Sequence, residues 1–256
     1  MDKENKQGAE VEGGFRTNAE QTVGARLHEV FDRSPDAWEK KLDSFTKFIR
    51  RQALTKTLAQ YEIFKRILPV KGSIVECGVF RGHSLFAWAH FSAIMEPINF
   101  TRRIYGFDSF GGFPGVGEKD VSEKSKHVRA GDLYADVYDE LVELREIHDS
   151  NRLLNHIDKL HLVRGDATKT IPEFVVANPH LVVSLLYLDF DLYEPTRVAI
   201  EQFVPRMPRG AIIAFDELDN PLWPGETRAV LDTLGFGKLR IERVHFDPYI
   251  GFAVID

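Results

Sequence analysis

Acidic side chains at the ends of apolar runs are the main chemical signal of this sequence. One run ends in Asp189 and Asp191, and a second ends in Asp216 and Glu217. Continuous apolar runs predict buried parallel strands, and open α/β sheets bind their ligands outside the carboxyl ends of such strands. Acids that share one crevice repel each other. A hard divalent cation, a raised pKa on one acid, or exposure to water must therefore compensate them.

Earlier strand candidates also end in acids, at Glu76, Asp108 and Asp166. Glu76 leads into a glycine-rich turn containing Gly78 and Gly82, where the backbone turns tightly and approaches a ligand closely. Asp108 follows Glu76 by about 30 residues, near the offset at which an acid meets a pair of ribose hydroxyls. A single acidic strand end is weak evidence, but this ordered series indicates a cofactor site beside the carboxylates.

Composition limits the class of function. Hydrophobic residues make up 43% and charged residues 28% of the 256 residues, as is typical of a soluble globular protein. The net charge of −6 gives no basic footprint for nucleic acid, and no apolar run is long enough to cross a bilayer. The only cysteine, Cys77, fits a reducing compartment and is expected to be a small buried hydrophobe. We therefore expect a cytoplasmic protein with a small-molecule substrate. The acidic composition leaves its oligomeric state open, a homo-oligomer included.

The chain divides into three predicted segments. Residues 1–22 are polar and almost free of large apolar side chains, which predicts a disordered arm. Residues 23–70 carry apolar side chains at the 3–4 spacing of amphipathic helices, which predicts a helical appendage. Residues 71–256 alternate strand and helix patterns, which predicts the ligand-binding domain.

This alternation predicts a Rossmann-like α/β fold. The helix candidates span residues 84–94, 130–157, 167–177, 195–204 and 224–233. Only Asp247 and Pro248 separate the last two strand candidates, 239–246 and 249–255, so they predict a closing hairpin with an antiparallel final strand. A mostly parallel sheet closed in this way is typical of class I methyltransferases rather than of nucleotide-dependent dehydrogenases.

An irregular stretch at residues 109–130 follows Asp108. It is rich in Gly and Pro and carries Phe110 and Phe113, which would be poor choices for a free loop. Long loops at carboxyl strand ends are usually functional lids or disordered insertions. We expect a lid.

Three motifs together resemble the macrocin O-methyltransferase family. They lie at Val75–Gly82, Gly106–Pro114 and Leu188–Thr196. Members of that family are metal-dependent enzymes that use S-adenosylmethionine to methylate sugar hydroxyls in antibiotic biosynthesis. The chain departs from the family's pattern at Asp216-Glu217, where two aspartates are usual, and in the loop at residues 115–129.

The resemblance implies a site for S-adenosylmethionine. The residues implied to contact it are Glu76, Gly78, Arg81, Gly82, Ser84, Asp108, Ser109, Asp166, Ala167 and Asp189. Asp108 would accept hydrogen bonds from the ribose hydroxyls, and Asp166 from the adenine amino group. Asp166 is also expected to cap the helix that follows it, and Ser84 to cap the helix after the glycine-rich turn.

A metal and a base complete the implied site. Asp189, Asp216 and Glu217 are assigned to Mg²⁺ or Mn²⁺, because hard oxygen ligands suit such cations. Asp189 thereby also takes part in catalysis, since the metal would hold the acceptor hydroxyl. Asp191 is assigned as the general base, with a fourth ligand or a helix cap as the alternative.

Three other functions are considered. A catechol-type enzyme with a flat phenolic acceptor would use the same cofactor, but such enzymes tend to carry a lysine near the position of Asp191. A non-catalytic module would keep the cofactor pocket alone, although every expected acid is present. A nicotinamide-dependent oxidoreductase is disfavoured by the closing hairpin.

Overall fold

The computed structural model describes residues 18–124 and 128–256, which form two compact units that divide between Lys56 and Thr57. The first unit contains the helices α2 (Asn18–Arg33) and α3 (Trp38–Asp43) and the 3-10 helix η1 (Phe45–Lys47). Residues 18–22, which the sequence placed in a disordered arm, begin α2. The remainder of the predicted arm lies outside the described residues.

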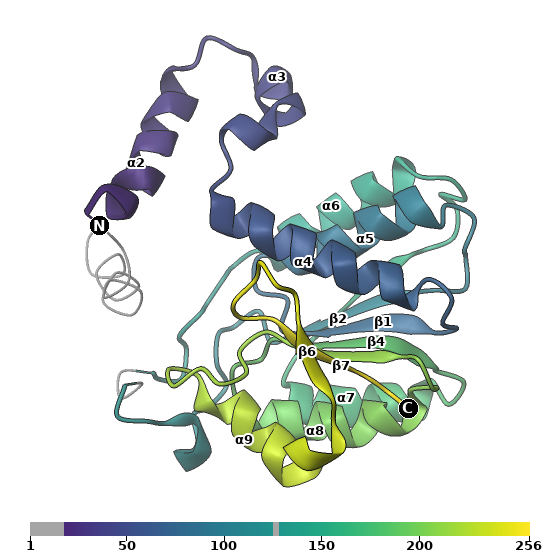
Figure 1. Ribbon diagram of the computed structural model, residues 1–256. Coiled ribbons are helices and arrows are strands. Elements are labelled where there is room, and N and C mark those ends of the chain that lie inside the picture. Colours follow the sequence, from purple (N-terminus) through teal and green to yellow (C-terminus); the bar gives the residue numbers. More distant parts are fainter. Residues whose placement is uncertain (1–17, 125–127) are drawn as a thin grey trace. The chain divides into compact units, whose positions relative to one another are not determined.

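A seven-stranded sheet organises the described part of the second unit (Figure 1). The order is β3-β2-β1-β4-β5-β7-β6. The strands are β1 (Ser73–Cys77), β2 (Ile104–Asp108), β3 (Leu160–Arg164), β4 (Val183–Leu188), β5 (Ile212–Phe215), β6 (Ile241–Arg243) and β7 (Gly251–Val254). Strands β1 to β5 are parallel, whereas β7 runs antiparallel to both β5 and β6. The predicted mostly parallel sheet with an antiparallel closing hairpin is confirmed. The hairpin connection, residues 244–250, is longer than predicted.

Helices cover both faces of the sheet (Figure 1). One face carries α4 (Arg51–Ile67) from Thr57 onward, together with α5 (His83–Met95) and α6 (Tyr138–Ser150). The other carries α7 (Ala167–Ala177), α8 (Tyr193–Phe203) and α9 (Pro224–Thr233). Each layer has its own apolar core, because side chains of a central strand alternate between the two faces. The short 3-10 helices of this unit are η2 (Glu118–Asp120), η3 (Val204–Arg206) and η4 (Phe236–Lys238).

Helix α4 belongs largely to the sheet domain. Its residues Ile63, Phe64 and Ile67 are fully buried in the core above the sheet. The sequence grouped all of residues 23–70 as an appendage, but the two units divide within α4. The 3–4 spacing of its apolar side chains predicts that α4 is a helix, but it does not reveal which surface the helix packs against.

The predicted helix 130–157 is shorter in the structure. Helix α6 begins at Tyr138 and ends at Ser150. Beyond it the Arg152 guanidinium donates to the carbonyls of Leu153, Leu154 and Ile157, which folds this segment into turns. Helices α7 and α9 have the predicted bounds.

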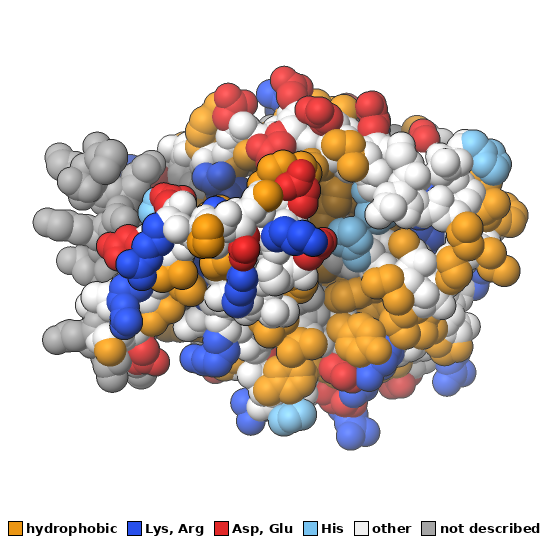
Figure 2. Space-filling view, turned by 90° about the horizontal axis from the view of Figure 1, so that it is seen from above, with side chains coloured by type: hydrophobic (Ala, Val, Ile, Leu, Met, Phe, Trp, Pro, Cys, Tyr) orange, Lys and Arg blue, Asp and Glu red, His pale blue; other side chains and the backbone are white. Residues whose placement is uncertain are grey.

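The surface above the sheet carries mixed side chains. On the face seen in Figure 2, Lys and Arg side chains are scattered among acidic and apolar ones rather than gathered into one patch. No helix among the described residues has the length and apolar character needed to cross a membrane.

Candidate functional site

The acidic ends of β1, β4 and β5 lie side by side. Leu188 at the end of β4 pairs with Cys77 of β1 and with Phe215 of β5. Beyond these pairs the backbone amide of Asp189 donates to the Cys77 carbonyl (2.7 Å), and the amide of Asp216 donates to the Leu188 carbonyl (3.0 Å). The predicted ligands Asp189 and Asp216 therefore leave adjacent strands at one edge of the sheet.

The acids at this edge are mostly removed from solvent. Asp191 and Asp216 are each 8% exposed, and Asp189 and Glu217 are half-buried. The Tyr187 hydroxyl donates to Asp216, and the side-chain amide of Asn220 donates to Glu217. These donors stabilise the negative charge of the cluster.

Glu226, in the first turn of α9, is an acid that sequence reasoning missed. It is fully buried, its Oε1 accepts the backbone N–H of Glu217 (3.0 Å), and its Oε2 has no hydrogen-bond partner among the described residues. Burial raises the pKa of Glu226 well above its usual range, partly opposed by the hydrogen bond from the Glu217 amide, and the neighbouring acids Asp216, Asp191 and Glu217 raise it further. Its spacing to Ala229 and Val230 could have predicted the burial of Glu226, since residues three and four positions apart share one face of a helix and both apolar residues lie on the buried face of α9.

Unusual backbone geometry marks the same edge. Four non-glycine residues just beyond β1, β2, β4 and β5 have positive φ: Phe80 (49°), Phe110 (53°), Asp191 (62°) and Asp219 (60°). Such conformations are uncommon outside glycine and cluster at functional sites. The left-handed backbone at Asp191 turns the chain out of β4 just before α8 begins.

Asp108 ties together the turns after β1 and β2. Its Oδ2 accepts the backbone amides of Val79 (2.9 Å) and Phe80 (2.8 Å), and its Oδ1 accepts that of Phe110 (2.7 Å). A carboxylate offers about four acceptor positions, so capacity remains for a further donor. The ribose contact of Asp108 stays a prediction, but the structure adds a role in shaping the glycine-rich turn.

The start of α5 differs from the prediction. Gly82, with φ 83°, is the N-cap, whereas Ser84 lies inside the first turn and is buried. The expected cap at Ser84 is therefore wrong, because the left-handed turn at Gly82 starts the helix two residues earlier. The guanidinium of Arg81 lies over the exposed Phe80 ring, 5.3 Å from its centroid.

The other predicted cofactor residues have defined surroundings. Asp166 caps α7 as expected, accepting from the backbone amide of Thr168 (3.0 Å). The Thr168 hydroxyl also donates to Asp166 (2.7 Å), and this bond is the main cause of the lowered pKa of Asp166. Ser109 closes the turn after β2 by donating to the Gly112 carbonyl (2.7 Å). Glu76 is fully buried within β1, and Ala167 is buried at the start of α7.

The predicted lid, residues 109–130, is attached to the sheet domain through several described contacts. Phe113 packs edge-to-face against Trp223 in a small apolar cluster with Val128 and Leu192. The buried carboxylate of Asp120 accepts the backbone amides of Gly117 (2.7 Å) and Tyr193. The predicted lid includes residues 125–127, which lie outside the described residues.

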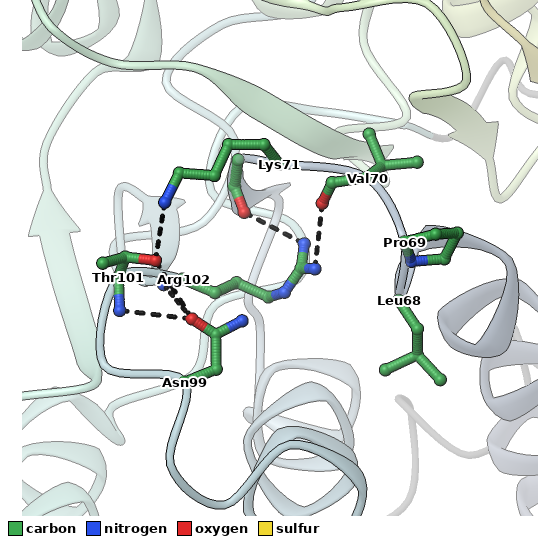
Figure 3. A pocket seen from close by; sticks show the side chains of 8 residues that line it. Leu68, Pro69, Val70, Lys71, Asn99, Thr101 and Arg102 are labelled. Carbon is green, nitrogen blue, oxygen red and sulfur yellow. Dashed lines mark hydrogen bonds between the residues drawn. The ribbon is translucent and has the colours of Figure 1, made fainter.

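A hollow of about 260 Å³ lies at the opposite end of the sheet (Figure 3). Its lining includes Lys71, Asn99 and Arg102. The buried Arg102 donates to the carbonyls of Ile67, Val70 and Gly72 and pairs with Glu96 (2.8 Å). These bonds occupy its guanidinium, so this hollow is a structural junction and remote from the acidic edge.

The acidic edge offers the oxygen ligands that a hard cation prefers, but its side chains are not arranged as a complete metal site. Asp189, Asp216 and Glu217 offer oxygen donors, and the unpartnered Oε2 of Glu226 lies in the same electrostatic environment. Within residues 18–124 and 128–256, no group of three or more His, Cys, Asp or Glu side chains is positioned to hold a metal ion. The metal assignment stays a prediction.

The strand order, the closing hairpin and the row of acids at the strand ends define a class I methyltransferase fold. The chain belongs to the Macrocin-O-methyltransferase (TylF) family, whose sequence pattern matches residues 50–233.

Two relatives, one of them with two solved structures, illustrate the likeness. An 8-demethyl-8-(2,3-dimethoxy-alpha-L-rhamnosyl)-tetracenomycin-C 4'-O-methyltransferase from Streptomyces olivaceus is 30% identical over 149 residues, which are 58% of this chain and 53% of that protein. The chain thus spans about half the length of this curated relative. A crystal structure of CalS11, a calicheamicin methyltransferase, is 32% identical with a TM-score of 0.88, covering 93% of both chains. An apo structure of CalS11, described as a TDP-rhamnose 3'-O-methyltransferase, is 31% identical with a TM-score of 0.81, covering 93% of this chain and 95% of that one.

Proposed function

We propose that this protein transfers a methyl group from S-adenosylmethionine to a hydroxyl of a deoxysugar in natural-product biosynthesis, with the help of Mg²⁺. The observation that carries the proposal is the row of adjacent acidic strand ends, in which Asp189 and Asp216 follow paired residues of β4 and β5. The names of two relatives support the substrate class, since one acts on a rhamnosyl tetracenomycin and the other on TDP-rhamnose.

The proposed cofactor site occupies the β1, β2 and β3 ends. The turn after β1, held in place by the carboxylate of Asp108, would receive the amino-acid end of the cofactor through backbone contacts. Asp108 would accept from the ribose and Asp166 from the adenine amino group, in the order in which their strands lie across the sheet. A cofactor held in this way would present its methyl group toward the ends of β4 and β5.

The proposed reaction is a displacement at the methyl carbon. Bound S-adenosylmethionine would supply the methyl group: the acceptor oxygen would bond to this carbon as the carbon–sulfur bond breaks, and the electrons of that bond would stay on sulfur. Asp191 would take the proton of the acceptor hydroxyl. The protein's main contribution is alignment and exclusion of water, to which the cluster of Phe113 and Trp223 would contribute.

Asp189, Asp216 and Glu217 are the proposed metal ligands. A bound Mg²⁺ would lower the pKa of the acceptor hydroxyl and fix its orientation. Glu226 supports the placement of Glu217 by accepting its backbone amide. Divalent charge would also offset the repulsion among these acids.

Calorimetry with S-adenosylhomocysteine, followed by turnover assays, tests the proposal. We expect binding of S-adenosylhomocysteine, and activity toward TDP-deoxysugars or glycosylated natural products that EDTA abolishes and Mg²⁺ or Mn²⁺ restores. Full activity of protein shown by elemental analysis to be metal-free would refute the metal. Preference for catechols over sugars would favour the phenolic alternative, and cofactor binding without turnover of either class would favour a non-catalytic module.

A further inference from the structure

A buried amide on α4 contacts the first turn of α5, directly after the glycine-rich turn. Gln60 is fully buried, and its Nε2 donates to the hydroxyl oxygen of Ser84 (2.7 Å). One turn earlier on α4, Thr57 Oγ1 lies 3.1 Å from Nε2 of His83. Helix α4 therefore contacts two successive residues at the start of α5.

This contact fixes what the Ser84 hydroxyl can do. A serine hydroxyl has one proton to donate and two lone pairs that accept. Because the Gln60 amide N–H occupies a lone pair of Ser84, the Ser84 proton points away from Gln60 and is available to an acceptor. Ser84 is itself only 5% exposed, so that acceptor must lie in an enclosed place.

The other end of the Gln60 amide lacks a partner among the residues that the structure describes. Its Oε1 is buried and accepts no hydrogen bond from the described residues. A buried carbonyl oxygen without a donor is costly, so such groups are usually satisfied by water or a ligand. The region around Ser84 thus offers a directed hydroxyl donor and, next to it, an acceptor that needs an N–H group.

An amino-acid group carries the matching pair, a carboxylate and an ammonium. We propose that Gln60 is a positioning residue for the amino-acid end of the cofactor. It orients the Ser84 hydroxyl toward the carboxylate of that amino-acid group. This inference rests on the proposed use of S-adenosylmethionine. It makes α4 a part of the cofactor site, although α4 precedes the first strand and lies outside the glycine-rich motif.

The test compares two ligands that differ in that group alone. S-adenosylhomocysteine carries the amino-acid group, whereas 5′-methylthioadenosine has the same adenosine and thioether without it. In Gln60→Met we expect affinity for S-adenosylhomocysteine to fall ~10-fold, the effect of about one hydrogen bond, with affinity for 5′-methylthioadenosine unchanged. In Gln60→Glu the affinity for S-adenosylhomocysteine should fall further, because a carboxylate there accepts the Ser84 proton and repels the ligand's carboxylate.

Ser84→Ala provides an independent measurement should the Gln60 variants fold poorly. It should show the same selective loss, and adding Gln60→Met to it should cost less than Gln60→Met does alone, since the oriented Ser84 hydroxyl is already gone. Thr196→Val is the matched control, because Thr196 lies on α8 in the opposite helix layer and is fully buried, with a hydroxyl that has no partner in the described part of the chain. It should leave the affinity ratio of the two ligands unchanged.

The outcomes separate this inference from the proposed function. Equal losses for both ligands in the Gln60 and Ser84 variants, or no loss for either, would overturn the role of Gln60 while leaving the enzyme class intact. Wild-type protein that binds neither ligand would overturn the proposed function, and this inference with it.

Discussion

The backbone of Gly78 passes so close to Asp189 that a Cβ atom at residue 78 would lie 1.9 Å from the Asp189 carbonyl oxygen. Gly78 also has φ 100°, a conformation that side chains rarely adopt. The proposed cofactor turn after β1 and the proposed metal ligand after β4 are therefore in direct backbone contact. Displacement of one must displace the other.

Gly78→Ala should therefore impair both halves of the site. The new methyl group cannot fit without separating the ends of β1 and β4, and we expect a loss of about 3 kcal/mol in the free energy of unfolding. Affinity for S-adenosylhomocysteine should fall as well. Denaturant titration and calorimetry measure the two effects. Gly115→Ala is the control, because no heavy atom of the described residues lies within 4 Å of a Cβ there. Equal stability of the two variants would contradict this account.

Asp120 should hold the insertion after β2 onto α8. Asp120→Asn keeps one acceptor oxygen but turns an N–H donor toward a second backbone N–H, so one of the bonds to Gly117 and Tyr193 is lost. We expect faster hydrogen exchange at these two amides, equivalent to about 1–3 kcal/mol of local stability. Asp232→Asn changes a solvent-exposed acid that pairs with Lys119 and accepts from the Tyr193 hydroxyl but from neither backbone amide, so it should have little effect. Unchanged exchange at both amides would show that other contacts hold the insertion.

The sheet and the row of acids were predictable because both depend on short stretches of sequence. Continuous apolar runs fix the strands, and the acid after each run fixes which edge collects the charge. The closing hairpin was predicted from a two-residue connection at Asp247 and Pro248, although the observed connection, residues 244–250, is longer. No comparable local signal marks the contact of Glu226 with the amide of Glu217, because it joins a helix to a loop through the fold.

Local residue preferences gave a wrong or incomplete prediction where backbone geometry determines the structure. Serine is a favoured N-cap, yet the cap of α5 is Gly82, since only the left-handed turn there directs the chain from β1 into the helix. Likewise, the three amides that converge on Asp108 come from two loops, and no spacing in the sequence reveals that convergence.

Lys159 should make the free energy of unfolding depend on pH in the alkaline range. Burial lowers the pKa of Lys159 to about 8 from 10.5, partly opposed by Glu96 and reinforced by the charges of Arg102, Arg152 and Arg103. Its Nζ donates to the Asn99 carbonyl (2.7 Å). Because the folded pKa is below the unfolded one, the unfolded state binds more protons between these values. The free energy of unfolding should therefore rise by up to ~3 kcal/mol from pH 8 to 10.5, and this contribution is lost as the pH falls through 8.

The lysine's contribution is isolated by comparing variants, since tyrosines and other lysines titrate in the same range. Lys159→Met should remove the rise seen in the wild-type protein, whereas Lys238→Met, at an exposed position, should keep it. Denaturant titrations at intervals of pH measure both. If the two variants have the same pH dependence, burial does not perturb Lys159 in the way described.

The final prediction separates a base from a ligand at Asp191. Asn is among the residues that best tolerate positive φ, so Asp191→Asn keeps the left-handed backbone at φ 62° while removing basicity. A sugar hydroxyl is a very weak acid and needs a proton acceptor as the methyl group arrives, so kcat should fall by about 10²–10⁴-fold with little change in Mg²⁺ or cofactor affinity. Asp219→Asn is the matched control, since Asp219 is an exposed acid with φ 60° after the neighbouring strand. Parallel loss of Mg²⁺ affinity and activity in Asp191→Asn would make Asp191 a ligand, and near-normal turnover would place the base elsewhere.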